Sequence, residues 1–201
     1  NAVFTLTVSR PSSQAVTVRY STAPGTASGN IDYTTASSII ATIPANSTTG
    51  VFSIVIRSET RFEQDETFFV NLTSPVGAVL GDAQALGTIL NDDPIPTASV
   101  NDISVVEGSI NGTARFTVAL SNASYLPVTI FFATRDGSAL APGDYTARIG
   151  SVVVSAGALV SPPVNITTRG DLVLEPDEAF FLDLTAATNA VLGDTEGACT
   201  I

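Results

Sequence analysis

The sequence predicts an all-β chain built from two tandem antiparallel β-sandwiches. Two observations lead to this prediction. The segments 4–89 and 116–201 align at a constant offset of 112 residues, from Phe4 to Phe116, so the chain contains one module twice. Within each copy, apolar and polar residues alternate over short segments that Gly, Pro, Asn and Ser separate, which is typical of strands with one buried face.

The strands are expected in the same order in both copies. Alternation predicts strands at 4–8, 16–21, 52–56 and 68–72 in the first copy, and at 116–120, 128–132 and 180–184 in the second. Turn residues lie between them, for example Pro24-Gly25 and Asp136-Gly137. No segment of ten or more residues carries a helical stripe. Several short strands in about 100 residues favour one β-sandwich per copy.

The two copies begin and end at different points of the module. The second copy is preceded by an opening segment, 98–111, that the first lacks, and the first copy ends in Asn91-Asp92-Asp93, which the second lacks. We therefore expect a first domain at 1–93 without its opening strand, a Pro-rich linker at 94–97, and a second domain at 98–201 without its closing segment. This phase indicates a part of a longer array, or a subunit completed by strands of its neighbours.

Composition restricts the class of partner. Eight basic residues, all arginine, and nineteen acidic residues give a net charge of −11, and the chain has no histidine. Such a field repels nucleic acid and anionic lipid and attracts cations. No apolar run is long enough to span a bilayer. Cys199 is the single cysteine, which excludes a disulfide within the chain and Cys-rich zinc sites. We expect no nucleic-acid partner and no membrane insertion.

An ordered set of motifs occurs along the chain. An opening Val105-Val106-Glu107-Gly108 is followed by a turn at 134–139 with Gly143-Asp144-Tyr145, and then by Glu-x-Asp-Glu-x-Phe, with Asn-Asp-Asp closing the first copy. Over nearly the whole chain this set resembles the Calx-beta family, which includes regulatory domains of sodium–calcium exchangers and modules of large surface proteins. The resemblance implies an immunoglobulin-like sandwich for each copy, with calcium held at one end by carboxylates from the loops.

The resemblance also implies a set of ligand residues. Pro24 stands where the turn aspartate of the first copy would be expected, so the first site is the poorer one. Without an ion, clustered carboxylates repel one another and the pKa of some must rise. Asp92 and Asp93 lie at the junction, so an ion there would also stiffen it. The expected ligands are Glu107, Asp136, Asp171 and Glu175 in the second copy, and Glu59, Glu63, Asp92 and Asp93 in the first.

Other repeated residues favour a structural interpretation. In Asp32-Tyr33 and Asp144-Tyr145, the aspartate is expected to organise a turn and the tyrosine to bury its ring with its hydroxyl satisfied. The Phe-Phe pairs at 68–69 and 180–181 are expected to place one ring in the core and one outward. Cys199 is expected to be a small buried apolar residue.

These observations predict a non-enzymatic protein. Nucleophile elbows, phosphate loops and histidine-based sites are absent from the sequence. We expect an extracellular or cell-surface structural or adhesive array stiffened by calcium, with neighbouring copies or repeats of the module, surface proteins or glycans as partners. Two alternatives stay open: a filament subunit assembled by strand donation, and a calcium-sensing regulatory domain.

Overall fold

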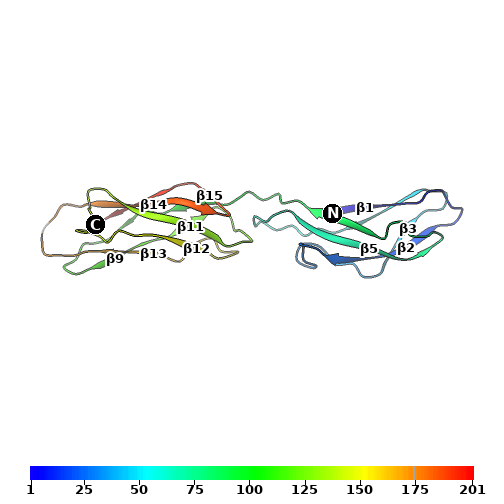
Figure 1. Ribbon diagram of the computed structural model, residues 1–201, viewed down its shortest axis with the longest axis horizontal. Coiled ribbons are helices and arrows are strands. Elements are labelled where there is room, and N and C mark those ends of the chain that lie inside the picture. Colours follow the sequence, from blue (N-terminus) through cyan, green and yellow to red (C-terminus); the bar gives the residue numbers. More distant parts are fainter. Residues whose placement is uncertain (174) are drawn as a thin grey trace. The chain divides into compact units, whose positions relative to one another are not determined.

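The computed structural model describes residues 1–173 and 175–201, and these residues form strands, turns and loops without a helix (Figure 1). No helix that could cross a membrane is therefore found in this part of the chain. Contacts divide the chain into unit 1, Asn1–Glu59 with Gln64–Asn91, and unit 2, Thr60–Glu63 with Asp92–Ile201. Each unit is described separately.

Unit 1 contains two antiparallel sheets. The larger has the strand order β3-β2-β5-β6, and the smaller pairs β1 with β4. The β1–β4 register places Phe4 opposite Phe52. A register shift interrupts the β2–β5 pairing between Thr17 and Arg19. The strands are β1 (Ala2–Thr7), β2 (Val16–Pro24), β3 (Ile39–Ile43), β4 (Thr49–Ile54), β5 (Glu66–Val76) and β6 (Gln84–Ile89).

The core of unit 1 lies between these two sheets. Val18 from β2 and Phe68 from β5 are buried in one apolar cluster, against which Phe4 from β1 and Phe52 from β4 pack. Phe68 is completely buried, and its ring stacks on that of Tyr33 with 4.6 Å between the centroids. Apolar residues from both sheets therefore meet face to face, which makes unit 1 a β-sandwich.

Unit 2 repeats this arrangement and adds an opening strand to each sheet. One sheet has the order β12-β11-β14-β16-β8, a second has the order β10-β7-β15, and β13 and β9 form a separate two-stranded sheet. The opening segment thus divides between the sheets, with β7 antiparallel to β10 and β8 parallel to β16. The strands are β7 (Thr97–Val100), β8 (Ile103–Ser104), β9 (Gly112–Phe116), β10 (Val118–Leu120), β11 (Val128–Asp136), β12 (Ile149–Val154), β13 (Val164–Thr168), β14 (Ala179–Thr188), β15 (Val191–Leu192) and β16 (Glu196–Thr200).

The core of unit 2 is more completely enclosed than that of unit 1. Phe116, Val118, Phe180 and Cys199 are all completely buried. Burial of the Cys199 thiol raises its pKa to about 11, so it is a protonated apolar side chain, as the sequence predicts. Ala98 of β7 is also completely buried, so the opening strand is part of this core.

The predicted linker residues 94–97 are bound to unit 2. The side-chain amide of Asn122 donates to Pro94 O at 2.8 Å, and Val191 N donates to Pro96 O at 2.8 Å. Thr97 already belongs to β7. The proline segment therefore leads directly into the opening strand.

The strands predicted from alternation are confirmed in both units. Those expected at 4–8 and 180–184, for example, lie in or overlap β1 and β14. The fold class is therefore two tandem immunoglobulin-like sandwiches, as the sequence predicts. Shorter strands such as β8 and β15, with two residues each, carry no periodic signal and are set by pairing with their neighbours.

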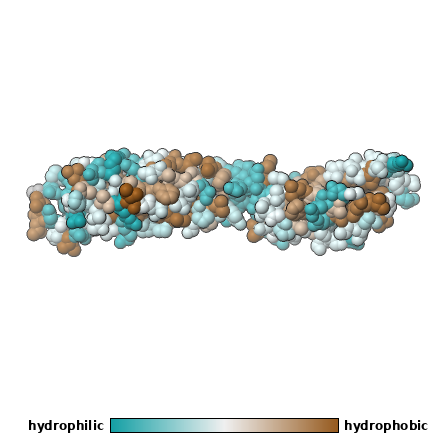
Figure 2. All heavy atoms as spheres, viewed as in Figure 1, coloured by the Kyte–Doolittle hydropathy of each residue, from teal (hydrophilic) through white to brown (hydrophobic). Residues whose placement is uncertain are grey.

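Apolar side chains are also distributed over the surface. In the view of Figure 2, hydrophobic and hydrophilic atoms are interspersed over both units. The most exposed apolar residues include Val79 of unit 1 and Val106 and Leu172 of unit 2, each more than 90% exposed. An interspersed surface of this kind is ordinary for a protein poor in charged residues.

The packing of β7 leads to a prediction about two equivalent glycines, Gly193 and Gly81. A Cβ on Gly193 would clash with the Thr97 side chain of β7 and lie 3.0 Å from Ser99 Oγ, whereas a Cβ on Gly81 of unit 1 would meet nothing within 4 Å. We expect Gly193→Ala to destabilise unit 2 by about 1–3 kcal/mol through overpacking. Gly81→Ala is the matched control and leaves unit 1 nearly unchanged. Urea denaturation followed by NMR signals of each unit measures both, and equal effects would contradict the described β7 packing.

Candidate metal centre

Three carboxylates of unit 2 come together at one end of the sandwich. One oxygen from each of Asp144, Glu175 and Glu178 lies within 4.8 Å of the other two. Asp144 follows β11, and the two glutamates lie just before β14. Asp144 and Glu178 are partly buried, whereas Glu175 is exposed. We call these three residues the acidic cluster.

Asp144 is held by the backbone of its own turn. Its Oδ2 accepts a hydrogen bond from Leu140 N at 2.6 Å, and its own N–H donates to Leu140 O at 3.0 Å. Its carbonyl accepts from Arg169 N at 2.8 Å. The sequence prediction that Asp144 organises a turn is thereby confirmed. Because the turn binds one carboxylate oxygen of Asp144, it also orients the second oxygen.

Glu178 is fixed by the sheet rather than by a turn. Its backbone exchanges two hydrogen bonds with Ile201, one of 2.9 Å and one of 2.8 Å. Two residues further on, the ring of Phe180 stacks on that of Tyr145 with centroids 4.2 Å apart and planes 10° from parallel. The stack joins the residue after Asp144 to the strand that follows Glu178, so both carboxylates are brought to one place.

Two further acids approach the acidic cluster on neighbouring loops. A Cβ on Gly170 would collide with Gly108 O and lie 2.5 Å from Ile110 O, so the absence of a side chain lets these loops touch. The first loop carries Glu107 and the second carries Asp171. Asp171 Oδ1 accepts from Val173 N at 2.6 Å. Gly170 is therefore required for the loops to approach.

Electrostatics shows that these acids form one group. Burial raises the pKa of Glu175, and the charges of Glu107, Asp171 and Asp144 raise it further. Burial also raises the pKa of Glu178, followed by the charge of Asp144 and a hydrogen bond between their side chains. The rise in pKa expected for clustered carboxylates is therefore present at two positions.

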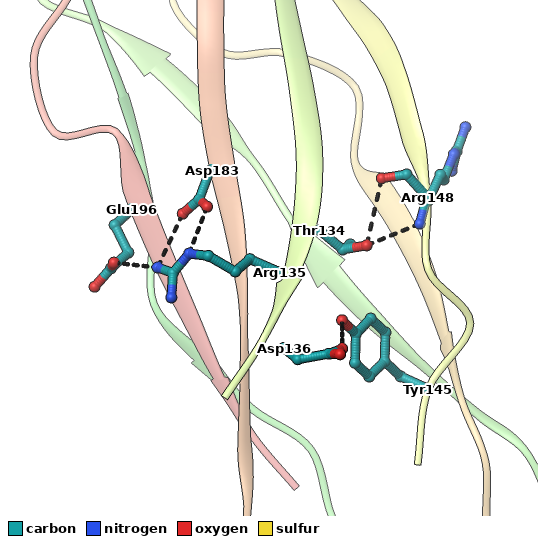
Figure 3. Close-up of polar contacts among 7 residues, drawn as sticks. All are labelled: Thr134, Arg135, Asp136, Tyr145, Arg148, Asp183 and Glu196. Carbon is teal, nitrogen blue, oxygen red and sulfur yellow. Dashed lines mark hydrogen bonds and ion pairs between the residues drawn. The ribbon is translucent and has the colours of Figure 1, made fainter. Parts of the chain in front are cut away.

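Asp136, which the sequence assigned to the ligand set, has a different set of partners. Its Oδ1 accepts a hydrogen bond from the Tyr145 hydroxyl at 2.6 Å (Figure 3). It also accepts one from Ala141 N at 3.1 Å. These bonds lower the pKa of Asp136. Burial and the adjacent carboxylate raise the pKa of Tyr145 to about 12. The buried ring with a satisfied hydroxyl that the sequence predicts for Tyr145 is confirmed.

Arg135 neutralises a separate pair of acids on the sheet surface. It forms ion pairs with Asp183 at 2.7 Å and Glu196 at 2.5 Å (Figure 3). Its guanidinium lies 4.3 Å from the centre of the Phe181 ring. Phe181, predicted to face outward, is thus partly covered from within unit 2. The positive charge of Arg135 is committed to these partners.

The ligands predicted in the first copy do not all belong to one unit. Glu59 is assigned to unit 1, whereas Glu63, Asp92 and Asp93 are assigned to unit 2. Asp32 Oδ2 also accepts from Ser28 N at 2.6 Å, which confirms its predicted turn role.

Sequence reasoning missed two members of the acidic cluster. The sequence pattern assigns Asp144 to a turn, and Glu178 of the Glu-x-Asp-Glu motif is not among the predicted ligands. A signal was present: both recur in the first copy as Asp32 and Glu66, at the same offset of 112 residues. In both copies these two acids lie next to buried aromatic residues, and this repeated pairing is the sequence signal for the cluster.

The donor set of the acidic cluster suits calcium. Calcium takes six to eight oxygens at about 2.3–2.6 Å, so opposite ligand oxygens lie roughly 5 Å apart. The mutual distances of at most 4.8 Å fall within that span. All three donors are carboxylates, which favours a hard cation over zinc or copper. The residues present therefore fit a calcium ion.

The two sandwiches, with acidic loops at one end of unit 2, place the chain in the class of tandem β-sandwich modules. The chain belongs to the Calx-beta domain family, whose profile matches residues 1–94 and again 90–201. A curated relative, extracellular matrix protein 3 of Lytechinus variegatus, is 28% identical over 158 residues, which is 70% of this chain and 5% of that protein. The chain therefore spans a small part of that relative.

Solved structures give further likenesses. The crystal structure of CBD12 from CALX1.2 aligns with 100% of this chain and 93% of its own, at 18% identity and a TM-score of 0.48. The crystal structure of calcium binding domain CBD12 of CALX1.1 aligns with 100% of this chain and 94% of its own, at 17% identity and a TM-score of 0.47.

Charge repulsion in the acidic cluster makes a testable prediction. The folded pKa of Glu178 is raised, so its negative charge destabilises the fold above that pKa and ceases to do so when the pH falls below it. We expect Glu178→Gln to stabilise unit 2 at neutral pH in chelator, with the gain shrinking as the pH falls through the folded pKa. Asp177→Asn, which removes an exposed charge next to it, is the control. A destabilised Glu178→Gln under these conditions would overturn the repulsion argument.

The hydrogen bond between Tyr145 and Asp136 predicts a dependence of stability on pH opposite to that expected from the Glu178 charge. The folded pKa of Asp136 is lowered, so the bond stabilises the fold above the unfolded pKa and this contribution is lost as the pH falls through the folded pKa. We expect Tyr145→Phe to be less stable than the parent at pH 7 and the difference to shrink in acid. Denaturation across pH measures this, with the half-exposed Tyr125→Phe as control. A pH-independent difference would contradict it.

Proposed function

We propose that the chain is a non-enzymatic structural or adhesive module of an extracellular repeat array, in which calcium bound at the acidic cluster stabilises unit 2. The acidic cluster of Asp144, Glu175 and Glu178 is the observation that carries this proposal. Two members have raised pKa values in the absence of a cation, so a bound cation would remove a cost that the fold otherwise bears.

The architecture supports a mechanical role. Each unit is a sandwich with its own core, and the family model matches twice along the chain. Tandem modules of this kind act as spacers whose stability depends on each module and on its neighbours. The partners proposed are therefore neighbouring repeats of the same module, with surface proteins or glycans as further candidates.

An extracellular location is supported by one relative. The name of the Lytechinus variegatus protein places that protein in the extracellular matrix. Regulatory calcium sensing, the alternative suggested by the exchanger domains of the family, uses the same acidic cluster and predicts the same ion binding. Attachment to a membrane transporter elsewhere in the gene would favour it.

A catalytic role has little support in the described residues. The clustered acids of unit 2 are loop carboxylates without a histidine, because the chain has none. Cys199 is buried and its pKa is raised to about 11, which makes it a poor nucleophile. The clustered carboxylates of unit 2 are instead suited to binding a cation.

Calcium titration tests the proposal. We expect calcium to bind unit 2 and to raise its melting temperature, with about 2.7 kcal/mol of stabilisation at a free concentration one hundred times the Kd. Glu178→Gln is expected to weaken binding at least tenfold, while Asp177→Asn binds almost as the parent does. Isothermal titration and calorimetric melting, with magnesium in parallel, measure this. Unchanged melting in millimolar calcium would rule the proposal out.

Stiffening of the junction by calcium is a separate part of the proposal. It rests on Asp92 and Asp93 in the short Pro-containing segment between the two copies. Small-angle scattering in calcium and in chelator measures it. A scattering curve that does not change while unit 2 binds calcium would confine the role of the ion to unit 2.

A further inference from the structure

Unit 2 has an open strand edge at β12. This strand lies at one end of the sheet order β12-β11-β14-β16-β8, and β11 is its one strand neighbour in the part of the chain that the structure describes. Thr134 N donates to Arg148 O at 2.9 Å, which fixes the residues of this strand pair that bond to each other. By alternation, Ile149, Ser151 and Val153 direct their backbone groups away from β11, towards the edge.

The edge of β13, in contrast, is covered by the chain itself. Thr146 N donates to Thr167 O at 2.9 Å, just before β12 begins. The guanidinium of Arg148 donates to Asn165 O at 2.7 Å. The segment that leads into β12 therefore closes β13. For the described residues, no backbone hydrogen bond of this kind covers the outer side of β12.

The equivalent edge of unit 1 is interrupted and capped. β3 begins at Ile39, directly after Ser38, whose φ of 55° breaks the extended backbone. The guanidinium of Arg19 on β2 donates to Ser38 O at 2.8 Å. Kinks and charged side chains at an edge hinder pairing with a further strand. In unit 2, Phe131 stands at the position of Arg19, and β12 runs from Ile149 to Val154 without a positive φ.

The side chains beside the open edge are exposed and mostly apolar. Ile149 is 86% exposed and Val153 is 43% exposed, with the small Ser151 between them. Phe131, also 43% exposed, lies opposite Ser151 on β11. Alternation places these four side chains on the outer face of the sheet. Exposed β-branched and aromatic residues along an uncharged edge favour pairing with a further strand.

The charge of the chain restricts where two copies can meet. Nineteen acidic and eight basic residues give a net charge of −11, so most approaches of one copy to another are repulsive. The segment 149–168, which contains β12, has no charged residue. Asp183 and Glu196 lie on β14 and β16, away from β12 in the strand order, and both pair with Arg135. The β12 edge is therefore a neutral surface on an acidic molecule.

β12 is also complementary to a second β12. In an antiparallel pair centred on Ser151, Ile149 stands opposite Val153 of the second copy, and Ser151 stands opposite its own equivalent. These residues all direct their backbone groups to the edge, so each opposed pair exchanges both of its N–H···O bonds. The pair of Ile149 and Val153 joins two β-branched side chains, and the small Ser151 leaves room at the centre.

We propose that β12 of unit 2 is a self-association edge, at which two copies of the chain pair antiparallel about Ser151 and join their five-stranded sheets. The inference goes beyond the proposed function, because it assigns a protein-binding surface that needs no calcium. The edge lies within the chain, between β11 and β13. Salt is expected to strengthen the association, since it screens the repulsion between two acidic copies.

Sedimentation equilibrium of the full 201-residue chain in chelator tests the proposal. We expect a monomer–dimer equilibrium at micromolar to millimolar concentration. Val153→Lys places a charge beside the edge and is expected to raise the Kd of the dimer at least tenfold. Thr42→Lys in unit 1 is the matched control and is expected to leave this Kd almost unchanged. It adds the same charge, and Thr42 lies opposite Thr17 as Val153 lies opposite Thr129.

Disulfide trapping locates the interface. Cys199 is buried and its pKa is raised to about 11, so Ser151→Cys supplies the reactive thiol. Opposed residues of a hydrogen-bonded antiparallel pair have Cα atoms about 5.5 Å apart, which a disulfide can span. We expect Ser151→Cys to form a covalent dimer under mild oxidation. Ile40→Cys, which lies opposite Arg19 in unit 1, is expected to stay monomeric.

Three results would each overturn the proposal. The first is a parent chain that stays monomeric at millimolar concentration in about 0.15 M salt, or a dimer that added salt dissociates. The second is an unchanged Kd for Val153→Lys; Ile149→Lys, at a more exposed position, replaces this variant if it misfolds. The third is a covalent dimer that Ile40→Cys forms as rapidly as Ser151→Cys does.

Discussion

The stack of Tyr145 on Phe180 is the contact on which the acidic end of unit 2 depends. Both rings are almost completely buried, and Phe180 also meets Phe116 of the opposite sheet edge to face, with 6.1 Å between centroids. Asp144 and Glu178 lie one and two residues from these rings in the sequence. Burial of aromatic surface, about 1.5–3 kcal/mol for a side chain of this size, thus holds together two carboxylates that repel one another.

The same device recurs in unit 1, where Tyr33 stacks on Phe68 at 4.6 Å and Phe4 lies edge-on to Phe68 at 6.0 Å. Asp32 and Glu66 flank these rings as Asp144 and Glu178 do in unit 2. The repeat therefore preserves a unit of packing together with the acids that it positions. The sheets of unit 2 contain in addition the opening strands β7 and β8.

Much of this fold follows from the sequence, because alternation identifies strands whose faces differ in burial, such as Phe68 and Val70 in β5. The candidate site was predictable in part. The charges of Glu107 and Asp171 raise the pKa of Glu175, whereas Asp136 accepts a hydrogen bond from the Tyr145 hydroxyl. The sequence pattern assigns Asp144 to a turn, and the structure shows that it also belongs to the acidic cluster. A one-dimensional pattern assigns one role to such a residue, whereas its two carboxylate oxygens can serve two partners.

Ring packing holds the carboxylates of unit 2 in mutual repulsion, and the proposed function requires that a calcium ion relieves this repulsion. Carbon-13 NMR titration of the Glu178 carboxyl, in chelator and then in calcium, measures this most directly. We expect a pKa above the ordinary glutamate value in chelator and a large decrease when calcium is added. An ordinary pKa that calcium leaves unchanged would contradict it.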